Sequence, residues 1–270
     1  MDNDYINQRT IRKLTATSFL AVIFCSCSHY YYVPNDQNVP LFREKNEFHL
    51  SGSYGLGTET SCLEIQGAYS VTDNFGIMTN FMSAKGIENS AESWAKGTYL
   101  DGAIGYYKPL RKSGVFEIYG GVGGSKQHHQ YRSEIFDPSN PAHNNLNAGT
   151  SDVSFIKIFV QPSIGITFNG FDFAFSTRFN RLSFNKIDNQ IDKLSNKHEF
   201  DKLYSTAQTK NFLFFEPALT IRGGWKYLKI QLQGATASYL NNEHYHFDQY
   251  HISVGLNVAI VKRYFKDVSK

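Results

Sequence analysis

The chain has 270 residues, of which 27 are basic and 24 acidic, and 15% of its residues are aromatic, with 22 Phe and 17 Tyr. A formal net charge of +3 without a concentrated basic face argues against a nucleic-acid partner. The negative mean hydropathy of −0.38 argues against a helical membrane protein, but it is compatible with a membrane β-barrel, whose strands expose only alternate residues to lipid.

The first 26 residues have the pattern of a secretory signal peptide. A basic cluster at Arg9, Arg12 and Lys13 precedes an apolar run over 14–24, which is too short to cross a bilayer as a helix. A buried amphipathic helix is the alternative, but the run has no helical stripe and it ends at a Cys-Ser-Cys sequence.

The end of this run resembles a bacterial lipoprotein signal, in which a small residue precedes a cysteine that receives acyl chains and becomes the first residue. Ser26 before Cys27 fits this pattern, whereas Phe24 before Cys25 does not. The resemblance implies that Cys27 is the lipid attachment point, which several acyl chains would hold at a membrane. Cys62 is then the single remaining thiol, and it cannot form an internal disulfide.

Residues 27–46 follow the expected cleavage site. They are polar, rich in tyrosine, and interrupted by Pro34 and Pro40. We expect this segment to be a periplasmic tether between the anchor and the first strand, or simply disordered.

A two-residue alternation of apolar and polar side chains is the repeating signal of residues 47–262. Near the end of the chain Ile252, Val254 and Leu256 share one face, and Ser253 and Gly255 share the other. The pattern predicts ten strands, over 47–57, 60–70, 74–84, 97–108, 114–127, 151–168, 171–183, 211–222, 225–238 and 247–261. Residues 263–270 remain as a C-terminal tail.

Proline falls inside two of these segments, at Pro162 and Pro217. Proline lacks the N–H that a strand ladder needs, and a closed barrel has no edge at which to place it. We therefore expect a bulge or a local break at each.

The connections between the segments alternate in length. Tight turns are expected at 72–74, 109–113, 169–170 and 223–224, and the other connections are 57–59, 85–96, 128–150, 184–210 and 239–246. All of the second set except the first are long. Short turns at one end and long loops at the other are typical of an outer-membrane barrel with short periplasmic turns and long extracellular loops.

An even number of strands places both ends of the barrel on the short-turn side. The N-terminus and the C-terminus are therefore both predicted to be periplasmic. The charged connection 184–210 is expected to be either a short amphipathic helix above the barrel or a solvated loop.

Charged residues recur on one face of the predicted strands. They are Glu64, Asp101, Glu117, Lys157, Asp172, Arg178, Glu216, Arg222 and Lys229. A charge facing lipid near the midplane costs about 2–4 kcal/mol, so we expect these residues to face inward as a paired charge network that fills a narrow lumen. The predicted fold is an all-β, antiparallel up-and-down transmembrane β-barrel.

Alternation alone does not tell inward from outward. The second hypothesis is therefore a soluble, lipid-tethered lipocalin-like barrel, with its apolar face inward around a hydrophobic ligand.

Two stretches resemble a known family. The sequence YYYVPNDQNVPLFREKNEFHLSGSYG and the later EIQGAYSVTDNFGIMTNF look like the lipid-anchored outer-membrane β-barrel proteins of Bacteroidota. The resemblance covers about residues 27–82 and implies an outer-membrane location. It implies no established reaction or substrate.

Sequence motifs for catalysis are absent: there is no G-x-S-x-G, Walker loop, dinucleotide fingerprint or H-E-x-x-H. The glycines of YGGVGGSK, 119–126, fall inside a predicted strand and indicate close strand packing rather than a phosphate site. The histidine pairs His128–His129 and His244–His246, and also His143, are expected on solvated loops, so we predict no metal site and no cofactor.

The third hypothesis is an outer-membrane hydrolase. It is disfavoured because the candidate acids lie at different depths and no Asp–His pair is evident at the rim. The sequence thus favours a non-catalytic outer-membrane lipoprotein with a structural role, or with surface binding through long loops. Its expected partner is outer-membrane lipid, and any envelope protein or small molecule that it binds is unidentified.

Overall fold

The computed structural model describes residues 29–87, 93–133, 147–209, 211–241 and 247–261. The predicted signal peptide, Cys27, the C-terminal tail, His143, His244 and His246 lie outside these residues. The described strands are β1 (Phe48–Leu56), β2 (Thr60–Ser70), β3 (Phe75–Gly86), β4 (Trp94–Leu110), β5 (Gly114–Arg132), β6 (Asn147–Thr167), β7 (Phe171–Ile191), β8 (Asn211–Gly224), β9 (Leu228–Thr236), the two-residue β10 (Ser238–Tyr239) and β11 (Tyr250–Ile260).

The strands form one closed antiparallel barrel. Each strand from β1 to β8 pairs with the next along the chain, β8 also pairs with β9, β9 pairs with β11, and β11 pairs with β1, so that ten long strands leave no edge. The predicted fold class is therefore confirmed. Alternation fixes the register, because a slip of one residue would turn every apolar side chain to the wrong face.

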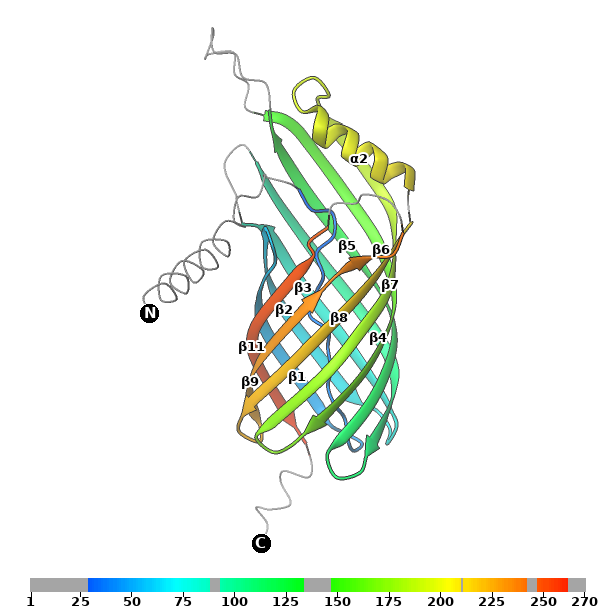
Figure 1. The fold of residues 1–270 in the computed structure, drawn as a ribbon, viewed down its shortest axis with the longest axis vertical. Helices are drawn as coiled ribbons and strands as arrows, with labels where there is room; N and C mark the ends of the chain where they lie inside the picture. Colours follow the sequence, from blue (N-terminus) through cyan, green and yellow to red (C-terminus); the bar gives the residue numbers. More distant parts are fainter. Residues whose placement is uncertain (1–28, 88–92, 134–146, 210, 242–246, 262–270) are drawn as a thin grey trace, which may run out of the picture.

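Four neighbouring strands, β4 to β7, are longer than the sequence pattern predicts. They have 17, 19, 21 and 21 residues, and they rise above the other strands at the end of the barrel where the long connections lie (Figure 1). Their extra residues are mostly polar and alternate weakly, which is why the apolar pattern ended earlier. The connections after β2, β4, β6 and β8 are all short, and they lie together at the opposite end.

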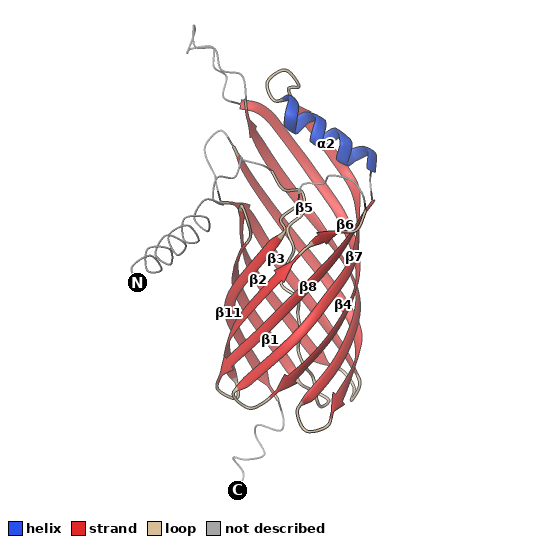
Figure 2. Ribbon diagram, in the orientation of Figure 1, coloured by secondary structure: helices blue, strands red, loops and turns tan. Residues whose placement is uncertain are grey.

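The connection between β7 and β8 contains helix α2 (Lys197–Thr209), the one helix of the described residues, which lies beside the tall strands at the long-connection end (Figure 2). Asn196 caps it, because its side-chain oxygen accepts a hydrogen bond from the Glu199 amide at 3.0 Å. Leu203 faces the barrel and is fully buried. No described helix is long and apolar enough to cross a membrane.

Both strand prolines interrupt their ladders, as predicted. The β6–β7 pairing stops at Val160 and resumes at Ser163, leaving Pro162 without a partner on that side. On β8 the pairing with β10 ends at Phe215 and the pairing with β9 begins at Ala218, so Pro217 sits at the break between them.

The segment before β1 does not form the expected periplasmic tether. Residues 31–42 are buried, and the segment runs down inside the barrel from the long-connection end to the short-turn end, where it enters β1 (Figure 1). We call residues 29–47 the plug. Because the plug crosses the lumen, the first and last described residues, His29 and Val261, lie at opposite ends of the barrel. The expectation that the chain enters and leaves on the same side is wrong for this described part.

Candidate functional site: the plugged lumen and its outer mouth

All nine residues of the predicted charge network lie inside the barrel. None of them is more than 6% exposed, and the list includes Arg178, Lys157 and Glu117 at 0%. Large apolar side chains on the same strands point outward instead, among them Leu63 at 62% exposed and Ile104 at 63%. The lipocalin-like hypothesis is therefore wrong, because it requires the apolar face to point inward around a ligand.

The plug has three layers that match the wall around it. Tyr31 and Tyr32 pack in an aromatic cluster near the long-connection end, and Leu41 and Phe42 pack in apolar clusters near the short turns. Between them the sequence PNDQN, 34–38, places amide and carboxylate groups at the level of the charged wall residues. The plug is thus apolar where the lumen is apolar and polar where it is charged.

The plug backbone satisfies several of the buried wall charges directly. The Glu64 carboxylate accepts hydrogen bonds from the Asp36 amide at 2.9 and 3.1 Å, and Glu117 accepts one from the Phe42 amide at 3.0 Å. Arg222 donates from Nη1 to the Val39 carbonyl at 2.8 Å. These bonds replace water for groups that would otherwise carry a large desolvation cost.

Gln233 holds the middle of the plug in the manner of a strand partner. It accepts a hydrogen bond from the Gln37 amide at 2.6 Å and donates to the Gln37 carbonyl at 2.9 Å. The Gln161 side chain donates to the Asn38 carbonyl at 2.7 Å. Amide side chains of the wall therefore supply the backbone partners that a neighbouring strand would supply in a sheet.

Asp36 is the most heavily bonded residue of the plug. Its carboxylate accepts hydrogen bonds from Ser53 at 2.7 Å and from Ser253 at 2.7 and 2.8 Å, and it lies 2.9 Å from His251 Nε2. The same ring nitrogen lies 3.3 Å from Glu64. His251 Nε2 therefore lies between two buried carboxylates, those of Asp36 and Glu64.

Cys62 completes a group that has the donor types of a metal site. The ligand atoms of Cys62, Glu64 and His251 lie within 4.8 Å of one another, and all three residues are buried. The histidine nitrogen, however, already bridges Glu64 and Asp36 as an ion pair. The absence of a metal site stays a prediction.

A second charge cluster surrounds Arg178 higher in the lumen. Its guanidinium donates to Gln161 at 2.9 and 3.1 Å, to the Asn35 side chain at 2.8 Å and to the Asp36 carbonyl at 3.2 Å, and it lies 3.8 Å from Glu216. Tyr32 donates its hydroxyl to Glu216 from the plug side.

Two further members of the predicted network lie near this cluster. Lys157 donates to Asn35 at 2.8 Å and lies 4.3 Å from the centre of the Tyr99 ring. Asp101 reaches the plug indirectly, through Asn80, which bonds both Asp101 and Asn38.

The remaining charges pair near the short turns. Lys229 lies 2.7 Å from Asp172 and donates to the Phe168 carbonyl at 2.9 Å, and Arg222 lies 3.9 Å from Asp172. Strand-to-strand pairing, which the sequence predicts for the whole network, therefore describes this end best. Elsewhere the plug supplies the missing partners. The signal for it in the sequence is the run of amides and carboxylate between Pro34 and Pro40.

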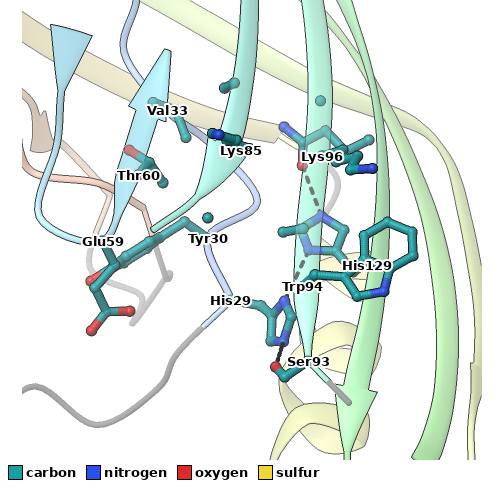
Figure 3. Close-up of a pocket in the computed structure, with 15 residues that line it drawn as sticks. His29, Tyr30, Val33, Glu59, Thr60, Lys85, Ser93, Trp94, Lys96 and His129 are labelled. Atoms are coloured by element: carbon teal, nitrogen blue, oxygen red, sulfur yellow. Dashed lines mark hydrogen bonds between the residues drawn. The ribbon is translucent and has the colours of Figure 1, made fainter. Parts of the chain in front are cut away.

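The mouth of the barrel at the long-connection end contains a pocket of about 70 Å³ (Figure 3). Its lining includes His29, Tyr30, Trp94, Lys96 and His129. His29 Nδ1 lies 3.2 Å from His129 Nδ1, and its Nε2 lies 3.2 Å from the hydroxyl of Ser93. The plug thus begins as part of the pocket wall, among aromatic and cationic side chains.

Burial sets the charge of His29. Desolvation lowers its pKa to about 4, although the nearby Glu199 carboxylate opposes this shift. His29 is therefore neutral at neutral pH.

An Asp–His pair does occur at the rim, contrary to the sequence analysis. His128 Nδ1 lies 2.7 Å from the Asp152 carboxylate, and the two residues are partners across β5 and β6. Both side chains are about half exposed and lie on the outer side of the wall. One reason given against a hydrolase is therefore wrong, and the absence of catalysis stays a prediction.

Comparison with known proteins shows no family for this chain. No family model matches the chain, and no curated protein matches it. Among solved structures it is similar to the outer-membrane protease OmpT from Escherichia coli, with 9% identity, 80% of this chain and 97% of that chain covered, and a TM-score of 0.39. It is also similar to the COG4313 outer-membrane channel from Pseudomonas putida F1, with 8% identity, 84% and 100% coverage and a TM-score of 0.39.

A third similar structure is the KdgM porin, with 8% identity, 79% and 99% coverage and a TM-score of 0.36. The three proteins are named as a protease, a channel and a porin. Similarity at this level has no bearing on the activity of the chain.

Proposed function

We propose that the chain is an outer-membrane β-barrel closed by its own plug, with a structural role or with binding at its outer mouth. The observation that carries this proposal is the burial of residues 31–42 inside the lumen, where they are hydrogen-bonded to the wall charges.

The outer surface supports a membrane location. Apolar side chains such as Leu63, Ile104 and Ile158 are about 60% exposed around the barrel, while the charges face the lumen. A soluble protein rarely exposes so continuous an apolar surface. A closed barrel with an apolar exterior, a charged interior and short turns at one end is the form in which strands cross the bacterial outer membrane.

The plug argues against a channel. A barrel of this size has a narrow lumen, and here a chain segment with its own side chains occupies it from end to end. Ions would have to displace a segment held by Asp36, Gln37 and Phe42. The mouth pocket and the long connections, rather than a pore, are then the surfaces that can meet a partner.

The lipid anchor belongs to the same proposal. Cys27 precedes His29 by two residues, and two residues of chain reach at most about 7 Å. His29 lies at the long-connection end, which faces outward in an outer-membrane barrel. We therefore place an acylated Cys27 at the outer surface, in contrast to the periplasmic anchor that the strand number alone predicts.

Single-channel conductance tests the closed lumen. Purified protein in a planar bilayer should show no stepwise conductance. A variant with residues 33–38 replaced by an equally long Gly/Ser sequence should show discrete steps, because the replacement removes plug side chains that bond the wall, such as Asp36 to Ser253 and Asn35 to Arg178. The folded band of unboiled samples on a gel serves as the control that both barrels are assembled. Steps of equal size in the unaltered protein would show that the lumen is open and would reject the proposal.

A further inference from the structure

The outer wall carries a row of cationic side chains at the long-connection end of β3 to β5. In the strand register Lys85 lies opposite Lys96, and Lys96 lies opposite His128. Lys126 lies two residues from His128 on the same face. The three lysines are exposed and point away from the lumen.

This arrangement is unfavourable by itself. Like charges directly opposite each other on one sheet face destabilise a strand pair. No carboxylate of the described residues forms an ion pair with any of these three lysines, and the nearest acidic member of the row, Asp152, is engaged by His128 at 2.7 Å. An anion between the lysines would remove the repulsion.

The lysines line a groove in the outer wall. Its volume is about 590 Å³, and its lining combines Lys85, Lys96 and Lys126 with the apolar side chains of Tyr54 and Leu63. The two apolar residues are 45% and 62% exposed. The groove therefore offers a cationic part and an adjoining apolar part.

The height of the groove matches a membrane boundary. Lys96 and Lys108 are the outward lysines at the two ends of β4, twelve residues apart. At about 3.3 Å per residue and a tilt of about 45°, they are separated by about 28 Å across the membrane. An apolar band about 25 Å tall fits between them. Trp94, whose ring lies 5.1 Å from Lys96 Nζ, occupies the interfacial level where aromatic residues gather.

We propose that this groove binds the phosphate group of an outer-leaflet lipid, with Lys85, Lys96 and Lys126 around the phosphate and an acyl chain along Tyr54 and Leu63. The site rests on the proposed membrane location. Lysine is a suitable ligand because its ammonium group is a compact point charge that pairs well with phosphate.

Thermal stability of the full-length protein in neutral detergent tests the site, with loss of the folded gel band as the readout. Added diphosphoryl lipid A should raise the midpoint temperature. The triple variant K85Q/K96Q/K126Q should lose most of that increase, and its midpoint without lipid should equal or exceed that of the unaltered protein, because the repulsion is gone. Lys108→Gln, on the same strand at the other end, is the matched control and should retain the full increase.

Several outcomes would overturn the proposal. One is a rise in midpoint temperature with inorganic phosphate or phosphatidylcholine that equals the rise with lipid A. Another is that Lys108→Gln loses as much of the rise as the triple variant does. A third is that the triple variant keeps the full rise with lipid A. A lower midpoint of the triple variant without lipid would show that the lysines are stabilised within their own protein, for example Lys96 by the Trp94 ring, and would remove the argument from repulsion. Retention of the unaltered protein in a carbonate-washed membrane pellet separates these outcomes from failure of the membrane location itself.

Discussion

Most of the buried charges inside the barrel are stabilised by more than one partner. Arg178 is fully buried and still uses both sides of its guanidinium, toward Gln161 and toward Asn35. An unpaired charge at this depth would cost several kcal/mol. Opposite charges on neighbouring strands supply part of the compensation, and the backbone of the plug supplies the rest. The residue-level reason for the plug is therefore the charge of the lumen.

Protonation of His29 should loosen the outer end of the plug. Burial lowers its pKa to about 4, below the value of about 6.5 in an unfolded chain. The undocked plug therefore binds the proton more tightly, and docking weakens as pH falls from about 6.5 to about 4, by at most about 1.4 kcal/mol per pH unit. Hydrogen exchange of residues 30–33, corrected for the intrinsic pH dependence, should accelerate over this range.

The control for this prediction is His29→Gln, which keeps hydrogen-bonding groups but does not titrate in this range. Its exchange should be nearly independent of pH between 4 and 6.5. The same acceleration in this variant would assign the effect to another group, such as His129, which lies 3.2 Å from His29.

Close packing between strands is the element-level role of the glycines in 119–126. Gly121 faces the lumen, and a Cβ there would lie 2.4 Å from the Phe159 ring and 2.7 Å from the Gly102 carbonyl. Gly120 faces outward, and a Cβ there would meet nothing within 4 Å. An added methyl group would therefore clash at Gly121 but not at Gly120. This difference agrees with a role of Gly121 in close packing rather than in phosphate binding.

Gly121→Ala should destabilise the barrel by about 1–3 kcal/mol, because the added methyl overpacks the lumen. Gly120→Ala should be neutral or stabilising by up to about 1 kcal/mol, because it restricts only the unfolded chain. The midpoint temperature of the folded gel band measures both. Equal effects of the two substitutions would contradict the packing argument.

Strand lengths show where element prediction succeeds and where it fails. The predicted ranges of β1 and β2 agree with the structure to within one residue at each end, because lipid on one side and lumen on the other impose strict alternation. The upper parts of β5 and β7 were predicted as loop, because above the membrane both faces are polar and alternation is lost. There each strand continues because it pairs with its neighbour, and the sequence of one segment alone does not show this pairing.

The orientation of the whole molecule gives the last prediction. An epitope tag inserted between Ser28 and His29 should be reached by antibody on intact cells, because the plug begins at the long-connection end. A tag placed between Arg111 and Lys112, in a short turn, should be reached only after permeabilisation.

If antibody on intact cells reached only the tag between Arg111 and Lys112, the long connections would face the periplasm. Inaccessibility of both tags on intact cells would reject an outward location of the plug entrance.

The sequence by itself determined the strand number, the alternating short and long connections and the grouping of Glu64, Arg178 and the other lumen charges on one face. These are properties of local periodicity, and periodicity is visible in one segment at a time. Only the tertiary structure decided which face points inward, because alternation is symmetric between the two sides of a sheet. The plug also came only from the structure, because its bonds from Asp36 to His251 and from Gln37 to Gln233 join residues about 200 positions apart, and a polar, proline-containing stretch has no periodicity of its own.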